Sequence, residues 1–272
     1  MFQEKTFDTG QILINYAEGP DSGAPLVVLH GGTVCWQFML PVLRLLAGRW
    51  HIFACDLRGH GRSGRAPGKY TLPDFSADVT ALLRRIKEPA VLLGFSWGGL
   101  VALHTAGQTP LRALILESPP LDLHRRRLCD SPVSQYFRWV KQSVQSAPDA
   151  EALAAAVCRK GLGRDSQSCA AWAAAFQQLD LDFIDMLLDN RALDGIDFKQ
   201  LLQAVSAPSL LLAGGQARSL SEEDIRFVRE NLNGARIAEI EGAENAIHHS
   251  HPEQMAGQIE AFIQLLRYRN KK

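Results

Sequence analysis

Short hydrophobic runs alternate with amphipathic stretches along most of the chain. Residues 2–7 and 10–17 have the pattern of two strands joined by a hairpin turn. Later runs are apolar almost throughout and predict strands at 25–30, 51–56, 91–94, 111–117, 209–213 and 235–240. Between them the pattern predicts helices at 38–46, 71–87, 97–107 and 222–231, and a last one from residue 252. Fully apolar strands are typical of a parallel sheet covered on both faces. We therefore predict an α/β fold with a mostly parallel central sheet flanked by helices.

The alternation stops between residues 119 and 205. This stretch holds helical segments rich in alanine and leucine, at 151–158, 169–179 and 183–188, and it has no strand pattern. We expect a helical insertion that forms a lid over the site. The chain would then consist of a core, residues 1–118 and 206–272, and a lid, residues 119–205. The alternative is that these helices simply flank the sheet.

The apolar run at 91–94 ends in the sequence Gly94-Phe95-Ser96-Trp97-Gly98. This Gly-x-Ser-x-Gly spacing allows a strand to turn sharply into a helix with the serine hydroxyl at the tip. The glycines leave room that a Cβ would fill, and the helix that follows directs free N–H groups toward the oxygen. The pattern predicts that Ser96 is a nucleophile. A glycine-rich turn without chemistry is the alternative.

Composition limits the partners, location and cofactors that we expect for this chain. The chain carries 29 basic and 29 acidic residues, so it gives no electrostatic reason to expect nucleic acid or an anionic membrane as a partner. The N-terminal residues are polar, and no apolar stretch approaches the roughly 18 residues of a membrane span. Five cysteines, an odd number without metal-binding spacing, favour reduced thiols and a cytoplasmic location. No dinucleotide-binding fingerprint occurs, so we expect neither a metal nor another cofactor.

These motifs together resemble the α/β-hydrolase family, from about residue 10 to residue 267. His30-Gly31-Gly32 is similar to the family's loop that supplies one oxyanion donor, and residues 56–63, Asp-Leu-Arg-Gly-His-Gly-Arg-Ser, are similar to the turn after its next strand. The resemblance implies that Ser96 attacks a carbonyl carbon. It also implies that the backbone N–H groups of Gly32 and Trp97 stabilise the oxyanion. We interpret four further polar residues as structural: His30, Asp56, Arg58 and His60.

A serine nucleophile needs a neighbouring imidazole, which a carboxylate orients. The family places its acid in a G-x-x-D phrase after the penultimate strand, and here Ala217 occupies that place. The family's histidine normally follows the last strand, and here Asn245 occupies that place. Asparagine can donate or accept a hydrogen bond but cannot carry a proton at neutral pH. Both departures remove the usual base and its acid.

His248 is the first candidate for a substitute base. If the three residues after Asn245 were extended, the imidazole would be displaced by about 10 Å, too far for contact with Ser96. If they coil into a helix, the rise is only about 4.5 Å and His248 comes within reach. The weaker candidates are His249 and His251 as bases and Glu244 and Asp122 as replacement acids. We expect Asp224 to lie in the first turn of its helix, where the dipole favours an anion.

Several functions remain open on these grounds. The first is a serine hydrolase acting on a small ester, thioester or carbon–carbon bond, with a non-standard or degenerate triad. The second is a cofactor-free lyase, cyclase or isomerase that uses the same pocket without an acyl-enzyme. The third is an inactive ligand-binding protein, or an engineered inactive variant carrying Ala217 and Asn245. Without triad members, binding and the oxyanion hole still give roughly 10³–10⁴-fold acceleration over water.

Aromatic residues in the insertion suggest a small-molecule substrate that is apolar or aromatic. They are Phe137, Trp139, Trp172 and Phe176. Packing within a helical core is the alternative use for such side chains. The run Arg125-Arg126-Arg127 would suit an anionic substrate group, although a solvated loop explains it equally.

Overall fold

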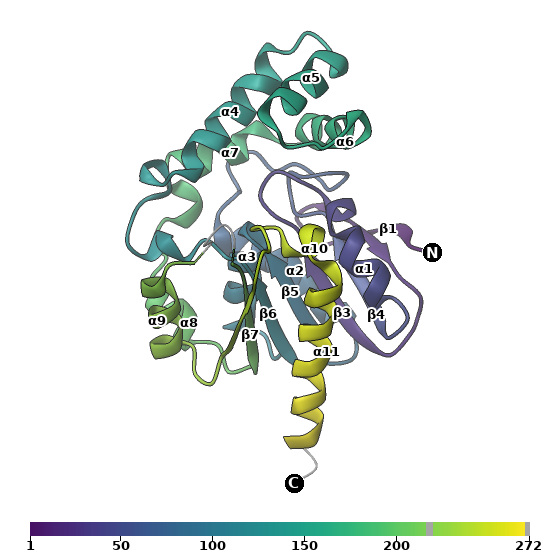
Figure 1. The fold of residues 1–272 in the computed structure, drawn as a ribbon, viewed down its shortest axis with the longest axis vertical. Helices are drawn as coiled ribbons and strands as arrows, with labels where there is room; N and C mark the ends of the chain where they lie inside the picture. Colours follow the sequence, from purple (N-terminus) through teal and green to yellow (C-terminus); the bar gives the residue numbers. More distant parts are fainter. Residues whose placement is uncertain (216–219, 270–272) are drawn as a thin grey trace.

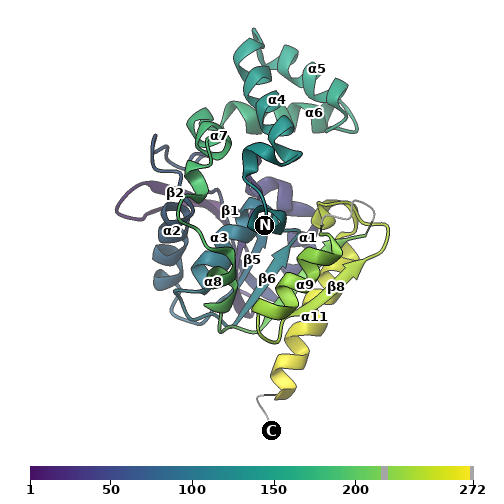
Figure 2. The same ribbon diagram turned by 90° about the vertical axis from the view of Figure 1, so that its left-hand side faces the viewer.

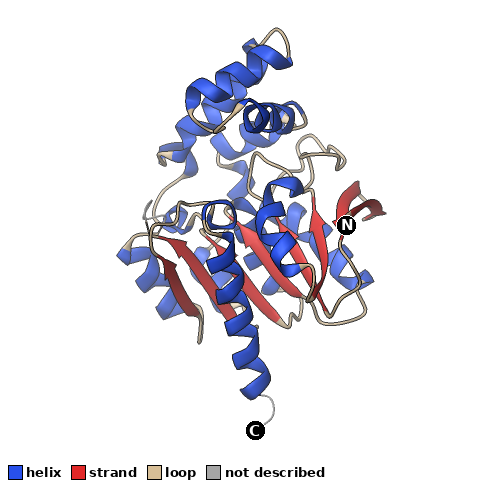
Figure 3. Ribbon diagram, turned by 45° about the vertical axis from the view of Figure 1, so that its right-hand side comes forward, coloured by secondary structure: helices blue, strands red, loops and turns tan. Residues whose placement is uncertain are grey.

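The computed structural model describes residues 1–215 and 220–269. Its centre is an eight-stranded sheet with the order β1-β2-β4-β3-β5-β6-β7-β8, shown in red in Figure 3. The strands are β1 Gln3–Asp8, β2 Leu13–Glu18, β3 Ala24–Leu29, β4 Trp50–Cys55, β5 Val91–Phe95, β6 Ala113–Glu117, β7 Ser209–Gly214 and β8 Arg236–Ile240. The pairs β1–β2 and β2–β4 are antiparallel and all the other pairs are parallel. The predicted fold class is confirmed.

Helices cover both faces of the sheet because alternate residues of its strands are buried on opposite sides. In β3, Val27 and Leu29 join one hydrophobic cluster, while Leu26 and Val28 join the other. The helices of this part are α1 Leu40–Leu46, α2 Leu72–Arg85, α3 Trp97–Ala106, α8 Phe198–Gln203, α9 Glu222–Asn231, α10 Ile247–Ser250 and α11 Pro252–Arg269. The first cluster includes residues of α2, α3, α8 and α9, and the second includes residues of α1, α10 and α11. None of the helices in the described ranges combines the length and the apolar character needed to cross a membrane.

The segment after β6 is helical, as the sequence indicates. Helices α4 Val133–Ser146, α5 Ala150–Lys160, α6 Ser166–Gln177 and α7 Leu181–Leu188 lie together beyond one end of the sheet (Figures 1 and 2). Short 3₁₀ helices η2 Leu121–His124, η3 Leu128–Asp130 and η4 Arg191–Leu193 connect this helical cluster to the sheet-bearing part. Residues 119–205 contain no strand.

The expectation that the cysteines are all reduced is wrong for one pair. Cys158, near the end of α5, forms a disulfide with Cys169 in α6, eleven residues later. The two helices form a hairpin that brings these positions together, with a Cα–Cα distance of 5.4 Å. Cys35, Cys55 and Cys129 are free thiols. The number of cysteines does not reveal this disulfide, because the pairing depends on the contact between two helices.

Candidate active site

Ser96 lies at a strained turn between β5 and α3. Its backbone has φ 51° and ψ −116°, a region that residues with a side chain rarely adopt. A Cβ at Gly94 would lie 2.2 Å from the carbonyl oxygen of Gly98, and a Cβ at Gly98 would lie 2.3 Å from the carbonyl oxygen of His30. The Ser96 N–H donates a 2.9 Å hydrogen bond to the carbonyl oxygen of Glu117. Close backbone packing therefore holds the serine at the tip of the turn, where it is partly exposed.

Two backbone N–H groups beside this serine have no hydrogen-bond partner among the described residues. A Cβ at Gly31 would lie 3.6 Å from Cβ of Ser96, and a Cβ at Gly32 would lie 3.3 Å from Cβ of Trp97. The loop that carries these glycines thus runs along the serine. Trp97 is the first residue of α3, so its N–H has no partner within the helix. The N–H of Gly32 donates to no other residue in the described ranges. The geometry suits the stabilisation of an oxyanion by these two donors.

His248 and Glu117 form a buried pair that the sequence analysis did not anticipate. His248 lies in α10, three residues after Asn245, and its side chain is buried. Glu117 is the last residue of β6 and is fully buried. Its Oε1 accepts a 2.9 Å hydrogen bond from the backbone N–H of His248 and lies 2.8 Å from Nδ1 of the imidazole. A carboxylate oxygen accepts hydrogen bonds, so the proton of this contact lies on Nδ1 of His248.

This pair lies beside Phe95, the residue before Ser96. The Phe95 ring lies 4.6 Å, between centroids, from the His248 ring. Phe95 also pairs in register with Glu117 across β5 and β6. Both residues of the pair therefore lie next to the residue that precedes Ser96. No hydrogen bond joins Ser96 Oγ to His248 among the described contacts. Catalytic hydrogen bonds often shorten only when substrate binds.

Four other residues named from the sequence are exposed or engaged in other contacts. Asn245 is exposed in the loop before α10, and Ala217 lies outside the described residues. Glu244 is exposed and faces Arg164 at 3.6 Å. Asp122 faces Arg126 at 3.7 Å. Asp224 forms an ion pair with Arg125. It lies in the first turn of α9, as expected.

The sequence does not identify Glu117 as a site residue, because it reads as the polar end of an apolar strand. A charged residue at the end of a buried run was the only signal in the sequence. Its partner follows 131 residues later and lies in α10, so the tertiary arrangement of β6 and α10 brings them together. Within the described ranges no group of three His, Cys, Asp or Glu side chains forms a candidate metal site.

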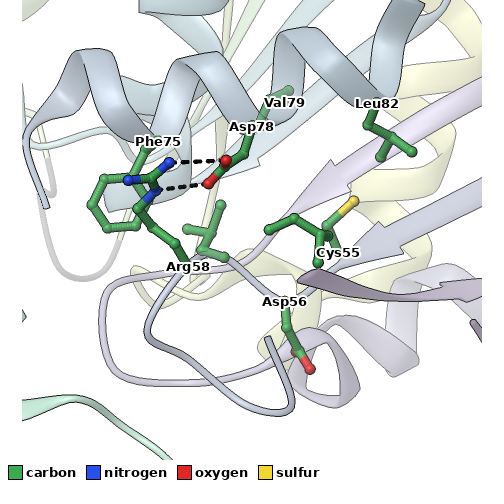
Figure 4. Close-up of a pocket in the computed structure, with 9 residues that line it drawn as sticks. Cys55, Asp56, Arg58, Phe75, Asp78, Val79 and Leu82 are labelled. Carbon is green, nitrogen blue, oxygen red and sulfur yellow. Dashed lines mark hydrogen bonds and ion pairs between the residues drawn. The ribbon is translucent and has the colours of Figure 1, made fainter. Parts of the chain in front are cut away.

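The turn after β4 is held by buried polar contacts. Arg58 is fully buried, and its Nε and Nη2 donate to the two carboxylate oxygens of Asp78 at 2.7 and 2.9 Å. Figure 4 shows these two side chains facing each other. Asp56 accepts hydrogen bonds from the backbone N–H groups of Trp36 and Arg62. These contacts agree with the structural interpretation of Asp56 and Arg58.

Acid is expected to destabilise the fold through two buried imidazoles. Burial lowers the pKa of His30 well below its usual value and also lowers the pKa of His60. Both rings are then neutral in the folded state, whereas the unfolded chain takes up protons near pH 6.5. The unfolded state binds more protons below that pH, so the free energy of unfolding should fall as pH drops from about 6.5. Urea unfolding at pH 7.5, 6.5 and 5.5 measures this fall. The variant His30→Asn should show a shallower one, and equal slopes in both proteins would contradict the prediction.

Comparison with known proteins agrees with the fold. The profile of the alpha/beta hydrolase family matches residues 26–258. The chain therefore belongs to this family. It is 27% identical over 268 residues to a pimeloyl-[acyl-carrier protein] methyl ester esterase of Neisseria meningitidis serogroup C, covering 90% of this chain and 95% of that protein. It is 26% identical over 262 residues to the enzyme of the same name from Xylella fastidiosa strain M23, covering 92% and 99%.

Solved structures show the same fold at lower sequence identity. An N-formylmaleamic acid deformylase of Pseudomonas putida S16 superimposes with a TM-score of 0.81 at 20% identity, covering 95% of this chain and all of that one. E-2-(acetamidomethylene)succinate hydrolase superimposes with a TM-score of 0.78 at 19% identity, covering 97% and 100%. At 19–20% sequence identity, this structural similarity supports the fold alone.

Proposed function

We propose that this chain is a serine-dependent hydrolase of carboxylic esters or thioesters. Ser96 is the nucleophile, the N–H groups of Gly32 and Trp97 form the oxyanion hole, and His248 is the base. The observation that carries the proposal is the buried contact between Glu117 and His248 beside the strained serine. This pair supplies the imidazole and carboxylate that are missing where Asn245 and Ala217 stand.

The reaction follows from these positions. Nε2 of His248 accepts the proton of Ser96 Oγ as the oxygen attacks the carbonyl carbon. Glu117 stabilises the imidazolium that forms, and the Gly32 and Trp97 N–H groups stabilise the oxyanion. The tetrahedral intermediate collapses when Nε2 returns the proton to the leaving alcohol or thiol. Water then attacks the acyl-enzyme through the same base, which releases the acid and restores Ser96.

We assign residues 119–205 the role of a lid over an apolar substrate. A Cβ at Gly32 would lie 3.6 Å from the ring of Phe137 in α4. The hydroxyl of Tyr136, also in α4, lies 2.7 Å from Oγ1 of Thr33. The helical cluster therefore contacts the loop that carries the oxyanion donor. The neighbouring aromatics also pack on one another, with 5.7 Å between the ring centroids of Trp172 and Phe176. The relatives named as methyl ester esterases make a small ester the first substrate to test.

A fluorophosphonate probe tests the proposal. The wild-type protein should form a covalent adduct that peptide mapping locates on Ser96, and it should hydrolyse p-nitrophenyl butyrate and a butyryl thioester. Ser96→Ala should form no adduct and should retain at most about 10⁻³ of the wild-type kcat/KM. No adduct and no hydrolysis in the wild-type protein would refute the proposal. An adduct on another residue would refute the assignment of Ser96.

Ligand binding without turnover is the second candidate function. It is favoured by one observation: Ser96 Oγ makes no hydrogen bond to His248 among the described contacts. This function predicts saturable binding of an ester or acid by calorimetry, without probe labelling. Rapid labelling of Ser96 would exclude it, because labelling requires an activated hydroxyl.

A further inference from the structure

His30 directly precedes Gly31 and Gly32 in the loop that carries the Gly32 donor. Its side chain is fully buried, and Nε2 accepts a 3.0 Å hydrogen bond from the backbone N–H of Leu57. Its Nδ1 lies 2.7 Å from the carbonyl oxygen of Gly31. Burial lowers the pKa of this imidazole well below its usual value, so the ring is neutral at pH 7. A neutral ring that accepts at Nε2 carries its one proton on Nδ1, which therefore donates to Gly31.

That carbonyl belongs to the same peptide unit as the Gly32 N–H. A trans peptide is planar, and its C=O and N–H point in opposite directions. A hydrogen bond at the Gly31 oxygen therefore fixes the direction of the Gly32 N–H. It also polarises the unit and makes the N–H a stronger donor. Neither glycine has a Cβ, so the backbone itself restricts this peptide little and an external contact has to hold it.

A second imidazole lies against the next carbonyl of the same loop. Nε2 of His60 lies 3.1 Å from the carbonyl oxygen of Gly32, and Nδ1 lies 2.8 Å from that of Arg58. The rings of His30 and His60 lie 5.2 Å apart, between centroids. The loop thus contacts two neighbouring histidines, whose rings are tilted by 55°, and its glycines also approach Ser96 and Trp97.

We propose that His30 is a positioning residue for the oxyanion hole. It holds the Gly31–Gly32 peptide so that the Gly32 N–H faces the oxygen of the substrate that Ser96 attacks. This inference rests on the proposed function. It goes beyond the structural role that the sequence suggests for His30, because it links a buried ring to the stabilisation of the transition state.

Two matched substitutions separate positioning from packing. In His30→Gln the amide oxygen replaces Nε2 and accepts from Leu57, but the donor to Gly31 is lost. In His30→Asn the amide nitrogen replaces Nδ1 and still donates to Gly31. Loss of a whole oxyanion donor costs about 10²–10³-fold in kcat, so a misdirected donor should cost about 10- to 100-fold. We expect His30→Gln to lower kcat and the rate of fluorophosphonate labelling by that factor with KM nearly unchanged. His30→Asn should stay within about threefold of wild type.

Equal rates in His30→Gln and wild type would overturn the proposal, and so would equal losses in the Gln and Asn variants, which would indicate packing alone. Nuclear magnetic resonance gives a readout that needs no activity. In glycine-labelled protein, the Gly32 amide resonance should shift upfield in His30→Gln and keep its position in His30→Asn.

The wild-type protein alone also tests the idea, should a variant fail to fold. The imidazole nitrogen shifts of His30 should show the proton on Nδ1, and a proton on Nε2 would overturn the proposal. If the wild-type protein is not labelled by the probe, the proposed function fails. The Gly32 and His30 resonances then still report whether the ring holds the peptide.

Discussion

Replacing His248 with glutamine is expected to lower kcat/KM for p-nitrophenyl butyrate by at least about 10³-fold, because glutamine cannot take the proton from Ser96. The glutamine side chain is polar and similar in length to histidine, so it should disturb the buried surroundings little. Initial rates at pH 8 measure the effect, and the midpoint of thermal unfolding shows whether the variant is folded.

Asn245 provides the matched control for this substitution. It stands at the position of the family's histidine but is exposed and lies in the loop before α10. Asn245→Ala should keep the wild-type kcat/KM within about twofold, as surface substitutions usually change little. Near wild-type activity in His248→Gln would remove His248 as the base. A large loss of kcat/KM in Asn245→Ala alone would indicate that the residue at the family's usual histidine position takes part in the reaction.

Arg58→Met is expected to lower the free energy of unfolding by about 3–5 kcal/mol, because it leaves the carboxylate of Asp78 buried without its partner. Arg58 is fully buried and its contact with Asp78 uses both carboxylate oxygens. Urea unfolding at pH 7 measures the change. The double substitution Arg58→Met with Asp78→Leu should recover most of the loss, because it removes both charges.

An exposed ion pair on the same turn is the control. Arg62 pairs with Glu4, and its side chain is 67% exposed. Arg62→Met should therefore change the free energy of unfolding by no more than about 1 kcal/mol. Similar losses in Arg58→Met and Arg62→Met would contradict the claim that the buried pair stabilises this turn.

The sheet and the serine turn were predictable because their signals are local. The apolar run before Gly94 and the glycines at 94 and 98 define both β5 and the sharp turn at Ser96. Strand limits elsewhere agree within a few residues, since each buried strand of a parallel sheet is apolar on both faces. The helical content of residues 119–205 follows from its own composition.

The acid of the candidate site could not be found in this way. Glu117 reads as the polar end of a strand, and nothing near it in sequence points to His248. Their contact arises because β6 lies next to β5 and because α10 coils the chain after Asn245. The disulfide between Cys158 and Cys169 likewise depends on the α5–α6 hairpin. Non-local contacts of this kind follow from the tertiary arrangement.

A crystal structure of the protein after reaction with the fluorophosphonate probe tests the central claim most directly. We predict a phosphonyl group on Ser96 Oγ, with Nε2 of His248 within about 3.2 Å of that oxygen or of the phosphonyl group. Glu117 should still contact Nδ1 of the ring. An adduct on Ser96 with the imidazole of His248 directed elsewhere, or with another side chain in its place, would contradict the account.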